Sequence, residues 1–250
     1  MKTTSPPPYA HRVILPACMA AMGILASGAF AATLAWEFDE KQGTTLGAVQ
    51  NSAGQVLWSG NLAESAVTGR GTLRLRNLDT EKCRSFARLG QPGKDGSTWL
   101  VVNIARWQFI DGVTRSTGVG LAQGADPKFT MLAEMNLQGS ADRGFFVSGD
   151  AMPENEGASG TKAFRLGDDT GGEPLTLALE YLPETNRFNL YRGGAGGRLA
   201  LLGGGKTSRR RDARYACIYI KNAVGAVDDE YIELGGLAVT TGRGTDGAVK

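Results

Sequence analysis

The chain has 250 residues, of which 27 are basic and 25 acidic, giving a formal charge of +2. This near balance does not indicate a general attraction to nucleic acid or to an anionic membrane. The length suits a single domain that can bury most of its apolar surface without needing disulfide bonds for stability.

The first 32 residues have the layout of a cleaved secretion signal. Lys2 and Arg12 give a positive start, an apolar run follows over 13–26, and Ala29-Phe30-Ala31 is a small-x-small pattern that signal peptidase recognises. This apolar run is shorter than a membrane-spanning helix requires. We expect cleavage near Ala31 or Ala32, a secreted or periplasmic mature protein, and no membrane insertion afterwards.

Removal of this segment would also remove His11, the only histidine. Serine–histidine triads, cysteine–histidine dyads and His-ligated zinc or copper are therefore excluded from the mature chain. Leu15-Pro16-Ala17-Cys18 could also be interpreted as a lipoprotein cleavage box. The apolar run continues past Cys18, however, and proline just before the cut is unusual.

Two cysteines, Cys83 and Cys217, remain after cleavage. In an oxidising compartment such a pair indicates one disulfide. It would close a loop of roughly 130 residues and stabilise the fold by about 4–5 kcal/mol in the chain-entropy description. The alternative is two separate buried thiols.

Glycine is abundant, with 36 residues, and no long stretch has a clean 3.6-residue hydrophobic period. Alternating apolar runs between glycine turns predict many short strands and no intervening helices, hence an all-β sandwich or jelly roll over 33–240 with a disordered tail at 241–250. A turn at 183–186 predicts a hairpin. We expect strands at 34–39, 71–76, 98–110, 118–122, 129–135, 144–147, 162–166, 175–181, 187–192, 214–221 and 230–240.

Three stretches together resemble the concanavalin A-like lectin/glucanase superfamily in its laminin-G-like secreted form. The first is 36–46 followed by 69–73, the second is Gly96-Ser-Thr-Trp-Leu100, and the third is the acidic, then alternating apolar segment 228–239. The resemblance implies a two-sheet antiparallel jelly roll whose concave face or rim loops often bind glycans. A fold does not by itself determine a function.

Period-2 alternation also predicts a binding face opposite the core. If Leu100, Val102 and Ile104 are buried, their neighbours point the other way, and the same holds for the strands at 187–192 and 214–221. Sugars stack on aromatic rings and need planar hydrogen-bond partners. The candidate ligand-binding residues are Trp99, Asn103, Trp107, Asn189, Tyr191, Tyr215, Tyr219 and Lys221.

The alternative is that both faces of these strands are covered and the aromatic residues fill a sandwich core. Val101 and Cys217 share the proposed binding face, and both residue types belong inside a protein.

Hydrolysis of glycosides requires two suitably spaced carboxylates. Glu37 and Asp39 share a strand face, but the third acid found in the glucanase cluster is missing, and Glu230 and Glu233 lie on opposite faces. A hydrolase is therefore not favoured.

A polysaccharide lyase is the stronger enzymatic alternative, with Tyr219 and Lys221 as catalytic residues for β-elimination on a uronate. Tyr219-Ile220-Lys221 is similar to the Tyr-Phe-Lys strand of alginate lyases, but the Tyr-Asn-Gln that should follow is replaced by Asn222-Ala-Val-Gly225. The segment 84–88 resembles their arginine-rich strand only loosely.

The sequence indicates neither a cofactor nor a dedicated metal site. Calcium is the ion that the oxygen ligands of Asp168-Asp169 and Asp228-Asp229 would suit, although acidic pairs in turns are commonly just solvated. The basic run 206–211 could bind an acidic polymer through its arginines, or it could be a solvated loop.

The sequence therefore favours a secreted, non-catalytic module that binds polysaccharide or another surface partner. A Tyr/Lys-based lyase is the first alternative. A structural envelope or adhesion protein without glycan specificity is the second.

Overall fold

The computed structural model describes most of the chain from Phe30 to Gly242. The described residues are 30–62, 64–78, 83–90, 96–109, 115–125, 131–140, 144–150, 159–167, 174–193, 198–207, 211–221 and 230–242. The predicted signal lies almost wholly outside them and stays a prediction, as does most of the predicted tail.

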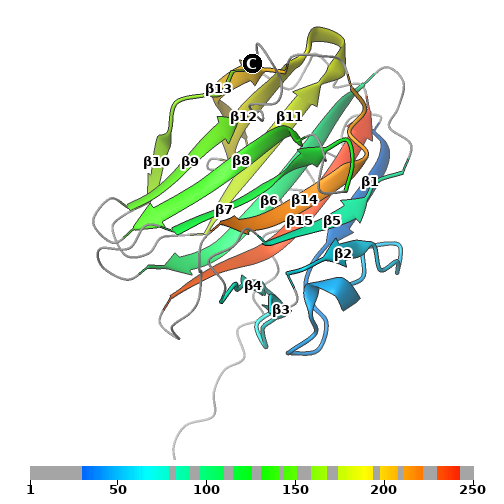
Figure 1. The fold of residues 1–250 in the computed structure, drawn as a ribbon, viewed down its shortest axis with the longest axis vertical. Coiled ribbons are helices and arrows are strands. Elements are labelled where there is room, and N and C mark those ends of the chain that lie inside the picture. The colour runs from blue at the N-terminus through cyan, green and yellow to red at the C-terminus, as the bar shows by residue number, and fades with distance from the viewer. Residues whose placement is uncertain are drawn as a thin grey trace, which may run out of the picture.

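The described part folds into two antiparallel sheets, which confirms the predicted all-β sandwich (Figure 1). The eight-stranded sheet has the order β13-β12-β11-β6-β15-β4-β3, and β1 pairs with the part of β15 beyond β4. Its strands are β1 (Phe30–Trp36), β3 (Ala66–Val67), β4 (Leu73–Leu75), β6 (Ser97–Gln108), β11 (Leu175–Leu182), β12 (Arg187–Gly193), β13 (Leu199–Lys206) and β15 (Tyr231–Gly242).

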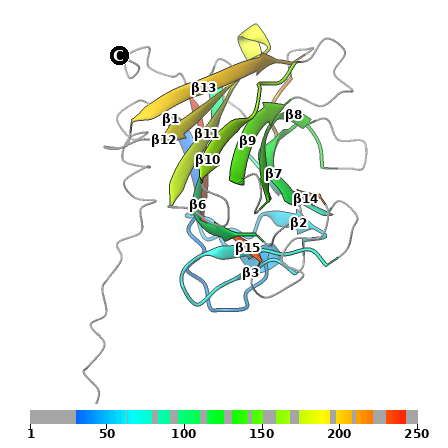
Figure 2. The ribbon, with the colours of Figure 1, turned by 90° about the vertical axis from the view of Figure 1, so that its left-hand side faces the viewer.

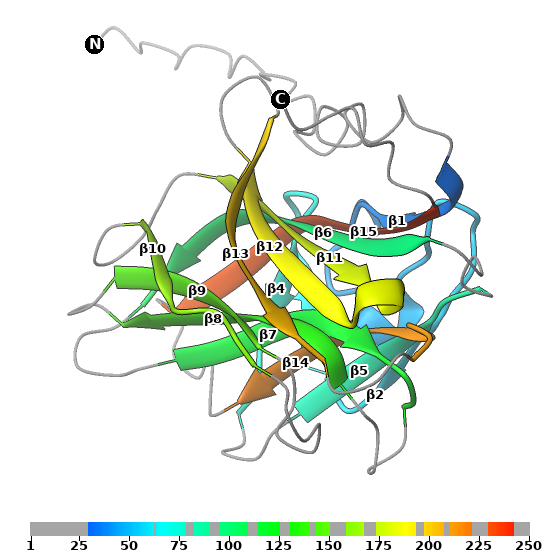
Figure 3. The same cartoon turned by 90° about the horizontal axis from the view of Figure 1, so that it is seen from above.

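The second sheet has seven strands in the order β10-β9-β8-β7-β14-β5-β2. The two sheets form separate layers, as Figures 2 and 3 show from the side and from above. The strands of this seven-stranded sheet are β2 (Trp58–Gly60), β5 (Cys83–Arg88), β7 (Arg115–Ala122), β8 (Met131–Ser140), β9 (Gly144–Asp150), β10 (Phe164–Gly167) and β14 (Tyr215–Lys221).

Helical structure among the described residues is confined to two short 3₁₀ turns, η1 (Leu46–Ala48) and η2 (Pro183–Thr185). Neither is long enough to cross a membrane. The second makes the predicted hairpin between β11 and β12, where Pro183 starts the turn and Asn186 adopts the left-handed conformation with φ 52°. Asparagine tolerates that conformation better than most residues do.

The core fills the space between the sheets and follows the predicted alternation. Leu100, Val102 and Ile104 of β6 are fully buried in it, as are Ile218 and Ile220 of β14. Each sheet therefore has an inner face on this core and an outer face that points away from it.

Trp107 lies in the core, so the prediction that it shares the outer face with Trp99 and Asn103 is wrong. Its ring stacks on Phe145 with centroids 4.4 Å apart. The cause is a β-bulge: Arg106 pairs with Glu233 and Ile104 pairs with Leu234, which leaves Ala105 unpaired. One extra residue reverses the alternation, so the odd-numbered position 107 points inward.

The predicted disulfide is also wrong, since no bridge joins Cys83 and Cys217 and both are buried thiols. Cys83 packs in the core between the sheets, whereas Cys217 belongs to a small apolar cluster on the outer face of the seven-stranded sheet. In the β14–β5 pairing Cys83 lies opposite Ile220 and Cys217 lies opposite Phe86. Side chains on opposite faces of one sheet cannot form a disulfide without moving the backbone.

Candidate glycan-binding faces

The remaining candidate residues are divided between the two outer faces of the sandwich. Trp99, Asn103, Asn189 and Tyr191 come together on the eight-stranded sheet, through β6 and β12. Tyr215, Tyr219 and Lys221 lie on β14 of the seven-stranded sheet. The structure thus yields two candidate sites on opposite sides of the molecule.

The first site is an aromatic platform made by Trp99 and Tyr191. Their ring centroids are 5.2 Å apart with the planes inclined by 32°. Val101, Ala178 and Leu199 pack with them in an apolar cluster separate from the core. Tyr191 is buried, but Trp99 is only half-buried, so part of the indole remains accessible to a ligand.

Polar side chains surround this platform and are held in place by hydrogen bonds. The carboxylate of Glu180, on the intervening strand β11, accepts hydrogen bonds from Asn189 Nδ2 and from the Tyr191 hydroxyl, both at 2.8 Å. Thr176 donates to Asn103 Oδ1 at 2.6 Å. Burial and the neighbouring Glu180 raise the pKa of Tyr191, so its hydroxyl stays protonated and continues to donate.

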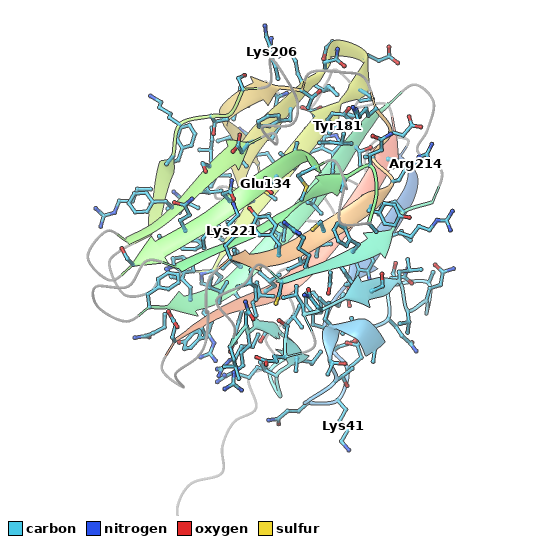
Figure 4. The ribbon with its side chains drawn as sticks, in the orientation of Figure 1. Lys41, Glu134, Tyr181, Lys206, Arg214 and Lys221 are labelled. Carbon is cyan, nitrogen blue, oxygen red and sulfur yellow. The ribbon has the colours of Figure 1, made fainter. Side chains whose placement is uncertain are left out.

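The second site lies on the central strands of the seven-stranded sheet, where Figure 4 labels Glu134 and Lys221. The ammonium group of Lys221 lies 5.3 Å from the centroid of the Tyr219 ring. Tyr219 crosses β7 at Gly118, where a Cβ would overlap the ring. Its hydroxyl donates to Asn136 Oδ1.

This second site is nearly closed to solvent at its centre. Tyr219 is 0% exposed and Glu134 is 1% exposed, although both side chains are on the outer face. Burial, followed by the charge of Glu134, raises the pKa of Tyr219 well above its ordinary value. The tyrosine therefore remains a neutral donor at physiological pH.

Several polar residues at the two sites were not singled out from the sequence. On β8, Glu134 and Asn136 alternate with Ala133 and Met135, and this period-2 pattern continues beyond residue 135, where the expected strand ends. On β11, Thr176 and Glu180 alternate with the buried leucines of the predicted hairpin. Asp150 reaches this site only through strand pairing, since it lies opposite Glu134, and Arg84, from the segment compared with the lyases, lies opposite Tyr219.

The acidic pairs considered for calcium, Asp168-Asp169 and Asp228-Asp229, lie outside the described residues. Within the described ranges, no three histidine, cysteine or acidic side chains are grouped as a metal would require. Glu37 and Asp39 follow the end of β1, and both are exposed.

Solved structures share the fold at low sequence identity. Rv0315 of Mycobacterium tuberculosis, described as an immunostimulatory antigen and pseudo β-1,3-glucanase, matches with a TM-score of 0.51 at 12% identity, over 86% of this chain and 100% of its own. The carbohydrate recognition domain of Emp47p matches with the same four values. The GH43 protein BlXynB of Bacillus licheniformis reaches 0.53 at 13% identity, over 83% of this chain but 39% of its own.

No family model matches the sequence, and neither does any curated protein. The two-sheet fold that the resemblance of three short stretches implied is nevertheless confirmed, whereas the laminin-G-like, secreted form stays a prediction. The chain has a concanavalin A-like fold.

Proposed function

We propose that the protein binds polysaccharide without cleaving it, at the aromatic platform of the eight-stranded sheet. The observation that carries the proposal is the half-buried indole of Trp99, packed against Tyr191 beside the fixed side chains of Glu180 and Asn189. A sugar ring can lay its C–H face on the indole. Its hydroxyl groups can then exchange hydrogen bonds with the carboxylate and amide groups nearby.

The platform is also pre-organised, which favours binding. Glu180 is held by two donors, and Asn103 is held by Thr176. Side chains fixed before the ligand arrives lose little conformational entropy on binding. The carbohydrate recognition domain of Emp47p, which shares the fold, supports this proposal, and the signal-like N-terminus supports a secreted or periplasmic location.

Replacement of Trp99 with alanine should weaken polysaccharide binding by about tenfold or more, because the stacking surface is lost. A glycan array and a panel of soluble polysaccharides would first identify a bound glycan, and calorimetry would then compare dissociation constants. Circular dichroism would verify that the variant remains folded.

The matched control is Tyr215→Ala, which removes a half-buried aromatic ring from the opposite sheet. The proposal expects this variant to bind as well as the unmodified protein. Weaker binding by Tyr215→Ala together with unchanged binding by Trp99→Ala would move the site to the seven-stranded sheet. No binding to any glycan would favour a structural envelope or adhesion protein.

A second candidate function is a polysaccharide lyase or hydrolase on the seven-stranded sheet. It is favoured by the contact between Lys221 and Tyr219, and by Glu134 lying directly opposite Asp150 on the neighbouring strand. Two arguments weigh against it. A tyrosine with a raised pKa is a poor general base, and a fully buried hydroxyl cannot touch a substrate.

An assay for cleavage would decide between the two functions. We expect incubation with uronate polymers to produce no rise in absorbance at about 235 nm and no new reducing ends, because the tyrosine keeps its proton. Product formation that is abolished by Tyr219→Phe would establish the lyase instead. Product formation that survives Tyr219→Phe but is lost in Glu134→Gln would indicate hydrolysis by the carboxylate pair.

A further inference from the structure

Three arginines converge on one carboxylate at the other end of the eight-stranded sheet. Arg74 on β4 and Arg106 on β6 both lie directly opposite Glu233 on β15, so the three side chains form a row across the outer face. Arg70, from the turn before β4, reaches the same carboxylate. We call Arg70, Arg74 and Arg106 the arginine cluster.

The carboxylate of Glu233 is fully buried and saturated with donors. Arg74 donates to Oε1 from both Nε, at 3.0 Å, and Nη2, at 2.9 Å. Arg106 donates from Nε to Oε2 at 2.7 Å and from Nη2 to Oε1 at 2.8 Å. Thr72 donates to Oε2 at 3.0 Å, and Arg70 is 3.5 Å from Oε1. One negative charge is thus set against three positive charges.

The arginine side chains are fixed by further contacts, and each of them is partly exposed to solvent. The ring of Tyr231 contacts both Arg74 and Arg106, whose Cζ atoms lie 5.0 Å and 4.5 Å from its centroid. Both side chains are 33% exposed, and Arg70 is 59% exposed. The Nη1 groups of Arg74 and Arg106 make no hydrogen bond to the residues that the structure describes.

This arrangement is more than a buried ion pair requires. A single arginine can satisfy a carboxylate in a bidentate pair. Here the additional guanidinium groups leave two positive charges uncompensated within the cluster, and the Nη1 groups of two partly exposed arginines are left as donors. Planar guanidinium groups in fixed positions are suited to carboxylate and sulfate groups of a ligand.

We propose that the arginine cluster binds a carboxylate or sulfate group of an acidic polysaccharide. The cluster shares its sheet face with the aromatic platform, since Trp99 and Arg106 are both on β6, seven positions apart. At about 3.3 Å per residue this is a separation of roughly 23 Å, which an extended polymer can span. The inference rests on the proposed function, because one polymer would occupy both the aromatic platform and the arginine cluster. It also specifies that this polymer is anionic.

The test compares dextran sulfate and polygalacturonate with neutral dextran, by calorimetry at low and high salt. Arg70→Ala removes the cation that is most exposed and most weakly bound to Glu233. We expect the variant to bind the acidic polymers about tenfold more weakly and to lose part of the salt dependence. Arg106→Lys, which keeps the charge but loses the bidentate fork, should also bind more weakly.

The matched control is Arg214→Ala, at the residue just before β14 of the opposite sheet. The Arg214 side chain is 61% exposed and forms an ion pair at 3.6 Å with Asp212, which closely parallels the exposure and ion-pair distance of Arg70. Equal weakening by Arg70→Ala and Arg214→Ala would overturn the inference, because it would reveal only general charge attraction. Absence of binding by the unmodified protein to either acidic polymer would also overturn it.

The two proposals can fail separately. If Trp99→Ala weakens binding and Arg70→Ala does not, the platform binds glycan and the anionic subsite is wrong. If Arg70→Ala weakens binding of the acidic polymers and Trp99→Ala does not, the arginine cluster binds the anion and the platform is wrong.

Discussion

Replacement of Trp107 with alanine should lower the free energy of unfolding by about 3–5 kcal/mol, the usual cost of removing a large aromatic side chain from a core. Trp107 is 2% exposed and stacks on Phe145. It also lies against Gly167 of β10, where a Cβ would overlap the indole, so the indole fills space that no neighbouring side chain occupies. Urea denaturation followed by circular dichroism would measure the loss.

The control for this prediction is Trp99→Ala, which removes the same indole from a half-buried position on the same strand. It should cost about 1 kcal/mol, because Trp99 lies outside the core and part of its surface is already in water. A Trp107→Ala variant with unchanged stability would contradict the position assigned to residue 107. Any loss of glycan binding in that variant has to be interpreted as a consequence of unfolding.

Replacement of Glu233 with glutamine should destabilise the protein by about 3–5 kcal/mol, because it removes one partner from a buried ion network and leaves the arginines facing one another. Glu233 is 0% exposed and binds Arg74 and Arg106 at 2.7–3.0 Å. Glu37→Gln is the control, since Glu37 is exposed just after β1. Equal stability of the two variants would contradict the assigned network.

The same network makes part of the stability dependent on pH. Burial raises the pKa of Glu233, but the hydrogen bonds from Arg106, Arg74 and Thr72 outweigh it, so the pKa lies below its ordinary value of 4.5. A carboxylate with a lowered pKa stabilises the fold at pH values above its unfolded pKa, and this contribution is lost as the pH falls through the folded pKa. The difference between the unmodified protein and Glu233→Gln should therefore be constant near neutral pH and shrink below about pH 4.5.

The sequence was sufficient to predict which residues of a strand point inward wherever the strand is regular. Leu100, Val102 and Ile104 are buried as the alternation indicated. The alternation failed at Trp107 because the bulge that reverses it depends on how β6 pairs with β15, which is distant in the chain. Local sequence contains no direct signal of such a pairing irregularity.

The composition of the candidate site was harder to predict because alternation does not say which sheet a strand joins. Trp99 and Tyr219 each point away from the core, yet they lie on opposite sides of the molecule because β6 and β14 belong to different sheets. Within one sheet the prediction succeeded: Trp99, Asn103, Asn189 and Tyr191 do share one face, through the hairpin that pairs β11 with both β6 and β12. In the same way, Cys83 and Cys217 lie on opposite faces because of how β14 pairs with β5, which their spacing in the sequence does not reveal.

The pairing of β1 with the end of β15 also determines where the two ends of the described chain lie. Phe30 pairs with Gly242, and the two strands run side by side in Figure 1. Facing residues of antiparallel strands have Cα atoms about 5 Å apart, so the polypeptide enters and leaves the sandwich at one corner. The two ends of the described chain are therefore neighbours in the same sheet.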